Sequence, residues 1–177
     1  MAFVIAIAGR IGSGKTTLSK DLASALSCPR ATFGDYVRSQ VEARGLPLTR
    51  ENLQVIGTQL LLNDPTAFCK SAISMSGWRP VSDLVIDGLR HLMTIPIIRE
   101  NTAPAEWRIV YISVPEDIRL KRLSDRGEGD ALNVQKIEAH SSEQELESIA
   151  SMADIVVRGD ELREKNVSKI RESLRNH

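Results

Sequence analysis

Short runs of consecutive apolar residues alternate along this chain with longer segments in which apolar residues recur every three or four positions. The runs that we predict to be β-strands are 3–8, 31–33, 84–86, 109–114 and 155–157. A run that is apolar throughout suits a strand buried on both faces, and alternation with helical segments is typical of a parallel sheet covered by helices on both sides. The pattern therefore predicts an α/β fold.

The helical segments show their own boundary signals. Leucines repeat every four residues over 18–26, which predicts an amphipathic helix. Thr49 stands where an N-cap would open a helix running towards residue 62, and Asp64 with Pro65 would end that helix and start another. These signals place two helices between the second and third strands.

Length and charge narrow the class of protein. The 177 residues, 42% of them hydrophobic, suit one domain, 1–177, with a single sizeable core. Since 23 basic residues balance 23 acidic ones, no overall positive field favours a nucleic acid or a membrane surface as partner. We therefore expect small molecules as ligands, bound through local clusters of charge.

The expected location is the cytoplasm. The apolar run 3–8 is too short for a signal-peptide core and lacks a basic leader. The two cysteines, Cys28 and Cys69, are too few and too far apart to indicate a disulfide framework or a zinc site, which fits a reducing compartment. Both thiols are predicted to be buried and structural.

The first strand leads directly into Gly9-Arg10-Ile11-Gly12-Ser13-Gly14-Lys15-Thr16, which satisfies the G-x-x-x-x-G-K-[ST] pattern of a phosphate-binding loop. Glycines let the backbone curl so that successive amides point at phosphate oxygens, and the following helix adds its positive end. Lys15 is expected to hold the β- and γ-phosphates, and the hydroxyl of Thr16 to ligate Mg²⁺. The residues predicted to bind ATP here are Gly12, Ser13, Gly14, Lys15, Thr16 and Thr17, the last without an assigned chemical role.

The segment Phe33-Gly34-Asp35-Tyr36-Val37-Arg38 follows the second strand, and it resembles the G-D-x-x-R motif of adenylate kinase and its nucleoside monophosphate kinase relatives. The resemblance implies that Arg38 clamps the acceptor phosphate and that Asp35 orients the acceptor or the metal shell. The alternative is a plain helix start, with Asp35 at the positive end of the helix and Arg38 in solvent.

The third strand ends in Val85-Ile86-Asp87-Gly88-Leu89-Arg90, which resembles the D-G-F-P-R stretch of the same kinases, one residue shorter, and the D-G-[IL]-R form of smaller nucleotide-kinase relatives. Ligands of open α/β sheets bind at such carboxyl ends. The resemblance implies that Asp87 binds Mg²⁺ through water and that Arg90 reaches the phosphates. The alternative is that Asp87 and Gly88 only form a tight turn. His91, the next residue, matches no motif.

Two further features lie on the donor side. Arg122-Leu123-Ser124-Asp125-Arg126 resembles the R-x-x-x-R entry to the lid of nucleoside monophosphate kinases, which implies a short lid over about 122–140 and catalytic roles for Arg122 and Arg126. The alternative is a solvated helix face, with Arg119 and Lys121 balanced by nearby acids. Residues 153–160 resemble the last strand and base-side loop of dephospho-coenzyme A kinases and the small nucleotide kinases, which implies that Gly159 lies beside the base of ATP. The alternative is a plain turn.

Taken in order, the motifs imply a three-layer P-loop kinase fold with a five-stranded parallel sheet of order 2-3-1-4-5 and acceptor-binding helices over about 34–76. The expected reaction is transfer of the γ-phosphate of Mg-ATP to a nucleoside or deoxynucleoside monophosphate, catalysed by Lys15, Asp87 and the lid arginines. One alternative is a dephospho-coenzyme A kinase, with Asp35 as base. The other is a nucleotide-binding switch or sensor. A monomer or a homodimer is expected, with Leu61, Leu62 or Trp78 as candidates for a dimer patch.

Overall fold

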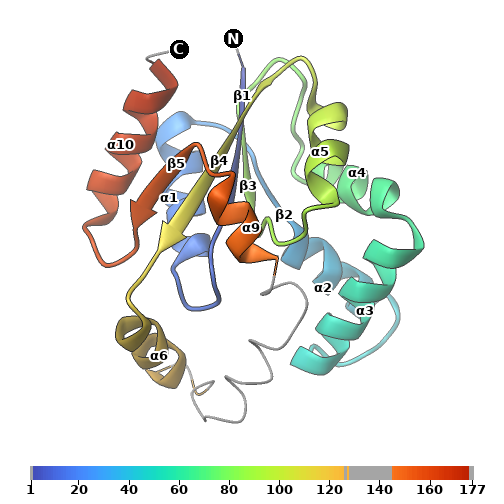
Figure 1. Cartoon of the computed structure of the whole chain (residues 1–177). Helices are drawn as coiled ribbons and strands as arrows, with labels where there is room; N and C mark the ends of the chain where they lie inside the picture. Colours follow the sequence, from blue (N-terminus) through green and yellow to red (C-terminus); the bar gives the residue numbers. More distant parts are fainter. Residues whose placement is uncertain (1, 126, 128–144, 176–177) are drawn as a thin grey trace.

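The computed structural model describes residues 2–125, 127 and 145–175 and has a parallel sheet at its centre (Figure 1). Its five strands lie in the order β2-β3-β1-β4-β5, and all neighbouring pairs are parallel. The strands are β1 (Phe3–Ala8), β2 (Arg30–Thr32), β3 (Leu84–Asp87), β4 (Glu106–Ser113) and β5 (Ile155–Arg158). The predicted α/β class and the predicted strand order are both confirmed.

Helices cover both faces of the sheet. Successive residues of β1 point to opposite faces of the sheet, so Val4 packs into the core on one face and Ile5 into the core on the other. Because β1 is central and buried on both faces, its carboxyl end opens in the middle of the molecule. The helices are α1 (Lys15–Leu26), α2 (Phe33–Ala43), α3 (Arg50–Asn63), α4 (Pro65–Met75), α5 (Thr94–Thr102), α6 (Glu116–Asp125), α9 (Leu146–Ser151) and α10 (Arg163–Arg175).

The connection between β2 and β3 differs from the sequence-based expectation. The sequence pattern predicts the second strand at 31–33, but the strand ends at Thr32, and the next residue already starts α2. The side chain of Thr32 accepts a hydrogen bond from the backbone N–H of Asp35 at 2.9 Å, so it caps the helix at once and leaves no loop. Residues 33–83, all of which the structure describes, therefore form three helices and not two.

The other boundary signals in this region are confirmed. Thr49 caps α3 by accepting from the N–H of Asn52 at 3.2 Å, and Asp64 caps α4 by accepting from the N–H of Ala67 at 2.8 Å. Asp64 is also the C-cap of α3, so one residue ends one helix and starts the next. Helices α5 and α10 were not predicted.

Both cysteines carry free thiols, and the two differ in burial. Cys69 is fully buried, as predicted, and burial raises the pKa of its thiol to about 12. Cys28 is half-buried, and burial raises its pKa to about 11. Both thiols are therefore protonated at neutral pH.

The residues considered for a dimer patch have different environments. Leu61 is buried, and Trp78 packs against the core while its indole N–H donates to the carbonyl of Ser82 at 2.7 Å. Leu62 has 69% of its surface exposed. Within the part of the chain that the structure describes, no helix is long and apolar enough to cross a membrane.

Candidate functional site

The phosphate-binding loop connects β1 to α1 in the centre of the sheet. Gly14 is the N-cap of α1 and has φ 96°, a backbone conformation that favours glycine. Lys15 begins the helix, is only 7% exposed and folds back over the loop. Its ammonium group donates to the carbonyl oxygens of Gly9 at 2.6 Å and Arg10 at 2.8 Å. The predicted phosphate-binding lysine is thus held at the loop by the loop's own backbone carbonyls.

Helix α6 braces this loop from the side. Arg119, which is 1% exposed, donates through Nη1 to the carbonyl of Ile11 at 3.4 Å and through Nε to Glu116 Oε2 at 2.9 Å. Hydrogen bonds from Arg119 hold the pKa of the Glu116 carboxyl below its ordinary value. Arg10 of the loop adds an ion pair to Glu116 at 4.0 Å. Arg119 does not lie on a solvated face, because its charge is satisfied inside the contact between helix and loop.

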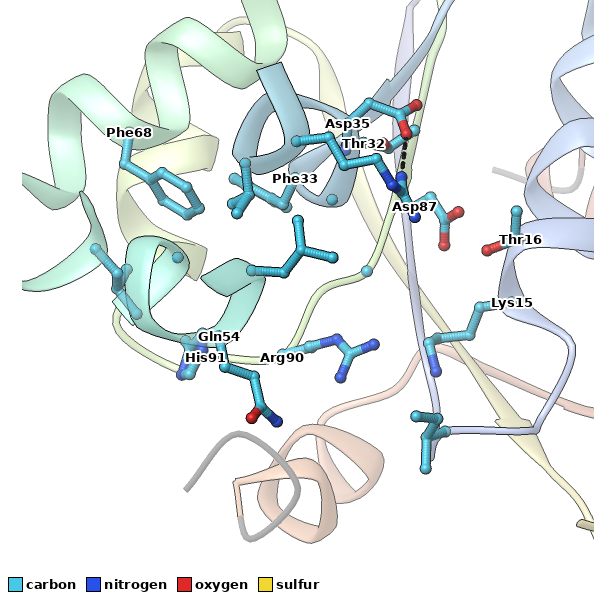
Figure 2. Close-up of a pocket in the computed structure, with 18 of the residues that line it drawn as sticks. Lys15, Thr16, Thr32, Phe33, Asp35, Gln54, Phe68, Asp87, Arg90 and His91 are labelled. Carbon is cyan, nitrogen blue, oxygen red and sulfur yellow. Dashed lines mark hydrogen bonds and ion pairs between the residues drawn. The ribbon is translucent and has the colours of Figure 1, made fainter. Parts of the chain in front are cut away.

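A cavity of about 830 Å³ opens beside the loop at the carboxyl edge of the sheet. Figure 2 shows Lys15 and Thr16 on one side of it and Phe33 and Phe68 on the other, with Asp87 between them. Among the described residues, six basic and two acidic side chains line the cavity, an excess of four positive charges. These residues are Lys15, Lys20, Arg30, Arg38, Arg50, Arg90, Asp35 and Asp87. The cavity therefore suits strongly anionic ligands.

The predicted acceptor residues lie in this cavity. Arg38 Nη1 donates to Asp35 Oδ1 at 2.7 Å, one helical turn away on α2, and both side chains are about half exposed to solvent. Asp35 also stands in the first turn of α2, where the helix dipole favours its charge. Asp35 and Arg38 therefore stand at the start of a helix and also line the cavity, so the two interpretations do not exclude each other.

Asp87 ends β3 and is 7% exposed. Its Oδ2 accepts a hydrogen bond from Arg30 Nη1 at 2.9 Å. Thr16 and Asp87 both line the cavity and offer the hydroxyl and carboxylate oxygens that suit Mg²⁺, so these two side chains fit the metal that the motifs imply.

The loop after β3 is fixed from a distant part of the chain. The carboxylate of Glu145, directly before α9, lies 2.9 Å from His91 Nδ1 and accepts from the backbone N–H of Leu92 at 2.6 Å. Arg90 and His91 both line the cavity, and the guanidinium of Arg90 points towards Lys15 (Figure 2). Glu145 therefore sets the position of the segment that carries Arg90.

Arg122 lies on α6 on the other side of the phosphate-binding loop. Its Nη2 donates to the carbonyl of Gly159 at 2.7 Å, and its Nη1 lies 3.4 Å from the carbonyl of Ser13. Gly159 is so close that an added Cβ would stand 2.6 Å from that same oxygen of Ser13. One contact thus joins Arg122, Gly159 and the phosphate-binding loop. Arg126 and the predicted lid beyond it lie outside the described residues, apart from Gly127.

Comparison with known proteins identifies the family of this chain. A family model described as an AAA domain matches residues 5–145. The UPF0200 protein of Thermococcus onnurineus is 32% identical over 130 residues, which cover 72% of this chain and 70% of that protein. The UPF0200 protein of Methanosarcina barkeri is 30% identical over 135 residues, or 73% and 69% of the two chains. The chain belongs to the UPF0200 family and carries the AAA domain.

Solved structures similar to this UPF0200 protein include several small kinases. Shikimate kinase from Bacteroides thetaiotaomicron superimposes with a TM-score of 0.59 at 17% identity, covering 98% of each chain. A gluconokinase from Sinorhizobium meliloti superimposes with a TM-score of 0.55 at 17% identity, covering 97% of this chain and 94% of the other. At this level of identity the similarity concerns the fold, and it confirms the predicted P-loop kinase architecture.

The cavity of the UPF0200 protein also contains residues that the motifs did not predict. They are Arg30, which binds Asp87, and Arg50 and Gln54 of α3. Arg30 begins a three-residue strand, where an arginine looks like a surface residue. No local pattern signals its contact with Asp87, because the two residues are 57 positions apart in the chain.

Replacing Arg122 with alanine is expected to weaken binding of Mg²⁺ with the non-hydrolysable ATP analogue AMP-PNP about tenfold, because the loop and Gly159 lose the guanidinium that joins them. Isothermal titration calorimetry measures this, with Lys121→Ala as the control on the same helix. An unchanged Kd together with a lower kcat would instead assign Arg122 to the transition state, as its resemblance to a lid arginine implies.

Proposed function

We propose that this protein transfers the γ-phosphate of Mg-ATP to the phosphate group of a nucleoside or deoxynucleoside monophosphate. The observation that carries the proposal is the continuous cavity that contains both Lys15 and Thr16 of the phosphate-binding loop and the three arginines Arg38, Arg50 and Arg90. Donor and acceptor phosphates can thus meet in one space, as an in-line transfer requires.

The charges in the cavity favour an acceptor that is itself a phosphate. A hydroxyl acceptor gains from a free carboxylate base, but Asp35 is engaged by Arg38 at 2.7 Å and by Arg30 at 3.7 Å. A monophosphate is already ionised and needs no base, and arginine forks match its oxygens. The apolar wall of Phe33, Leu53 and Phe68, with Gln54 beside it, offers a flat surface and a hydrogen-bonding group for the rest of such a molecule.

The mechanism consists of positioning and charge stabilisation. Lys15 leaves the carbonyls of Gly9 and Arg10 and binds the β- and γ-phosphates. Arg90, on the loop held by Glu145, points towards Lys15 and would offset the charge that develops in transfer. Thr16 and Asp87 would hold Mg²⁺, which when bound neutralises phosphate charge. Arg38 orients the acceptor oxygen for attack.

The test is a coupled ADP-release assay with Mg-ATP and a panel of acceptors. The panel holds ribo- and deoxynucleoside monophosphates, dephospho-coenzyme A, shikimate and gluconate. At least one monophosphate is expected to accelerate ADP release. Arg38→Ala is expected to raise the KM of that acceptor about 10- to 100-fold while changing the KM of ATP little. Arg44→Ala, at the exposed end of the same helix, is the control.

Other outcomes point to the alternatives. Acceleration by dephospho-coenzyme A alone would assign the protein as a dephospho-coenzyme A kinase. Acceleration by shikimate or gluconate alone would make it a kinase of hydroxyl acceptors, and Asp35→Asn should then abolish turnover. Slow release that no acceptor changes would favour a nucleotide-binding switch or sensor.

A further inference from the structure

Four side chains of alternating charge cross the cavity from the metal side to the acceptor side, and we call them the charge row: Asp87, Arg30, Asp35 and Arg38. Arg30 Nη1 lies 2.9 Å from Asp87 Oδ2, and Arg30 Nη2 lies 3.7 Å from Asp35 Oδ2. The other oxygen of Asp35 accepts from Arg38 Nη1 at 2.7 Å. Arg30 therefore joins a carboxylate suited to Mg²⁺ to the carboxylate that holds the acceptor arginine.

Burial decreases along the charge row. The side chains of Asp87 and Arg30 are 8% and 19% exposed, whereas those of Asp35 and Arg38 are 48% and 53% exposed. Ionic attraction is stronger where water is excluded, so Asp87 is the dominant partner of Arg30. Asp35 therefore interacts mainly with Arg38, the arginine proposed to bind the acceptor phosphate.

Arg30 is also tied to the helix that carries the donor residues. Its Nη1 lies 3.3 Å from Ser19 Oγ, and Ser19 Oγ donates in turn to the carbonyl of Thr16 at 3.0 Å. Ser19 is fully buried, so water does not compete for this contact. The guanidinium of Arg30 is thus held within reach of both carboxylates and can shift its interaction between them with little movement.

We propose that Arg30 couples the two halves of the site, so that binding of the magnesium nucleotide releases Arg38 for the acceptor phosphate; this inference rests on the proposed function. Asp87, once engaged with the water shell of the metal, attracts Arg30 less. Arg30 then interacts more strongly with Asp35. Asp35, now neutralised by Arg30, holds Arg38 less tightly.

The coupling works in both directions, as thermodynamic linkage requires. When a phosphate binds Arg38, Asp35 loses that partner and interacts more strongly with Arg30. Arg30 then holds Asp87 less tightly, and the Asp87 carboxylate becomes available to the metal. Donor and acceptor are both anions and would otherwise oppose each other's binding. Arg30 is therefore a positioning residue that makes their binding cooperative.

The experiment follows the guanidinium of Arg38 by side-chain NMR, with no acceptor present. Rotation about its Cζ–Nε bond is slow while a carboxylate holds the group. Addition of Mg²⁺ with AMP-PNP is expected to increase the rotation rate about fivefold or more, and AMP-PNP with EDTA is expected to leave it unchanged. In Arg30→Lys the increase should fall below about twofold, since one ammonium cannot bridge two carboxylates as a guanidinium fork does.

The control is Arg44→Lys, at the exposed C-cap of α2, which should respond like the parent. Calorimetry on the same samples reports whether the nucleotide binds. If the nucleotide binds but the rotation rate of the Arg38 guanidinium does not change, the coupling is wrong and the proposed function stands. The same holds if Arg30→Lys shows the full increase in that rate. Failure of magnesium AMP-PNP to bind at all would overturn the proposed function and the coupling with it.

Discussion

Replacement of Lys15 with alanine is expected to lower kcat about 100- to 1000-fold, because the transition state loses a cation placed where charge develops. Lys15 is the buried lysine of the phosphate-binding loop, and its ammonium donates to two loop carbonyls. Its ammonium is therefore held beside the backbone of the loop that is proposed to bind the phosphates. The coupled ADP-release assay measures the loss.

The matched control is Lys70→Ala, which removes an exposed lysine from α4. Its kcat should equal that of the parent. Thermal unfolding of Lys15→Ala separates a catalytic effect from a folding defect. A Lys15→Ala protein that is folded and retains more than about a tenth of the parental kcat would contradict the role assigned to this residue.

Replacement of Gly159 with alanine is expected to lower the free energy of unfolding by about 1–3 kcal/mol. The added Cβ would lie 2.4 Å from Val114 Cγ2, 2.6 Å from the carbonyl oxygen of Ser13 and 2.9 Å from Ile112 Cγ2. Two of these neighbours belong to the sheet region and one to the phosphate-binding loop, so the strain cannot be relieved without moving the loop. Urea denaturation measures the change, and nucleotide affinity should fall with it.

Gly57→Ala is the control for this prediction. At Gly57, in the middle of α3, the new Cβ would meet only Val37, at an ordinary 3.5 Å. Removing a glycine from a helix interior is expected to raise the free energy of unfolding by about 0.5–1 kcal/mol. Equal stabilities of Gly159→Ala and the parent would show that the loop adapts to the methyl group.

The sequence predicted the centre of the fold better than its periphery. The strand β1 and the phosphate-binding loop have a run of buried apolar residues and a specific motif, and both lie where the pattern placed them. The end of β2 was misplaced by one residue, since a three-residue strand has too little periodicity to compete with a threonine cap. Helix α10 was missed because it is mostly polar and only Asn166, Ile170 and Leu174 of it are buried.

The site was predicted where a motif exists and missed where a contact depends on the fold. Lys15, Asp35, Arg38, Asp87 and Arg90 line one cavity, although their chemical roles stay predictions. Glu145 meets His91 across 54 positions of the chain, and no local pattern signals such a pairing. Arg119 looked like a solvated residue because helical spacing cannot tell which charged face packs against a loop.

The raised pKa values of the two native thiols make this protein suited to site-specific labelling. At pH 7 the thiolate fraction of Cys28, with a pKa of about 11, is on the order of 10⁻⁴, and that of Cys69 is smaller still. A single cysteine introduced at the exposed Leu62 would therefore react with a maleimide dye while the native pair stays unmodified. Energy transfer from such a dye to a fluorescent nucleotide would then report directly whether α3 approaches the phosphate-binding loop during turnover.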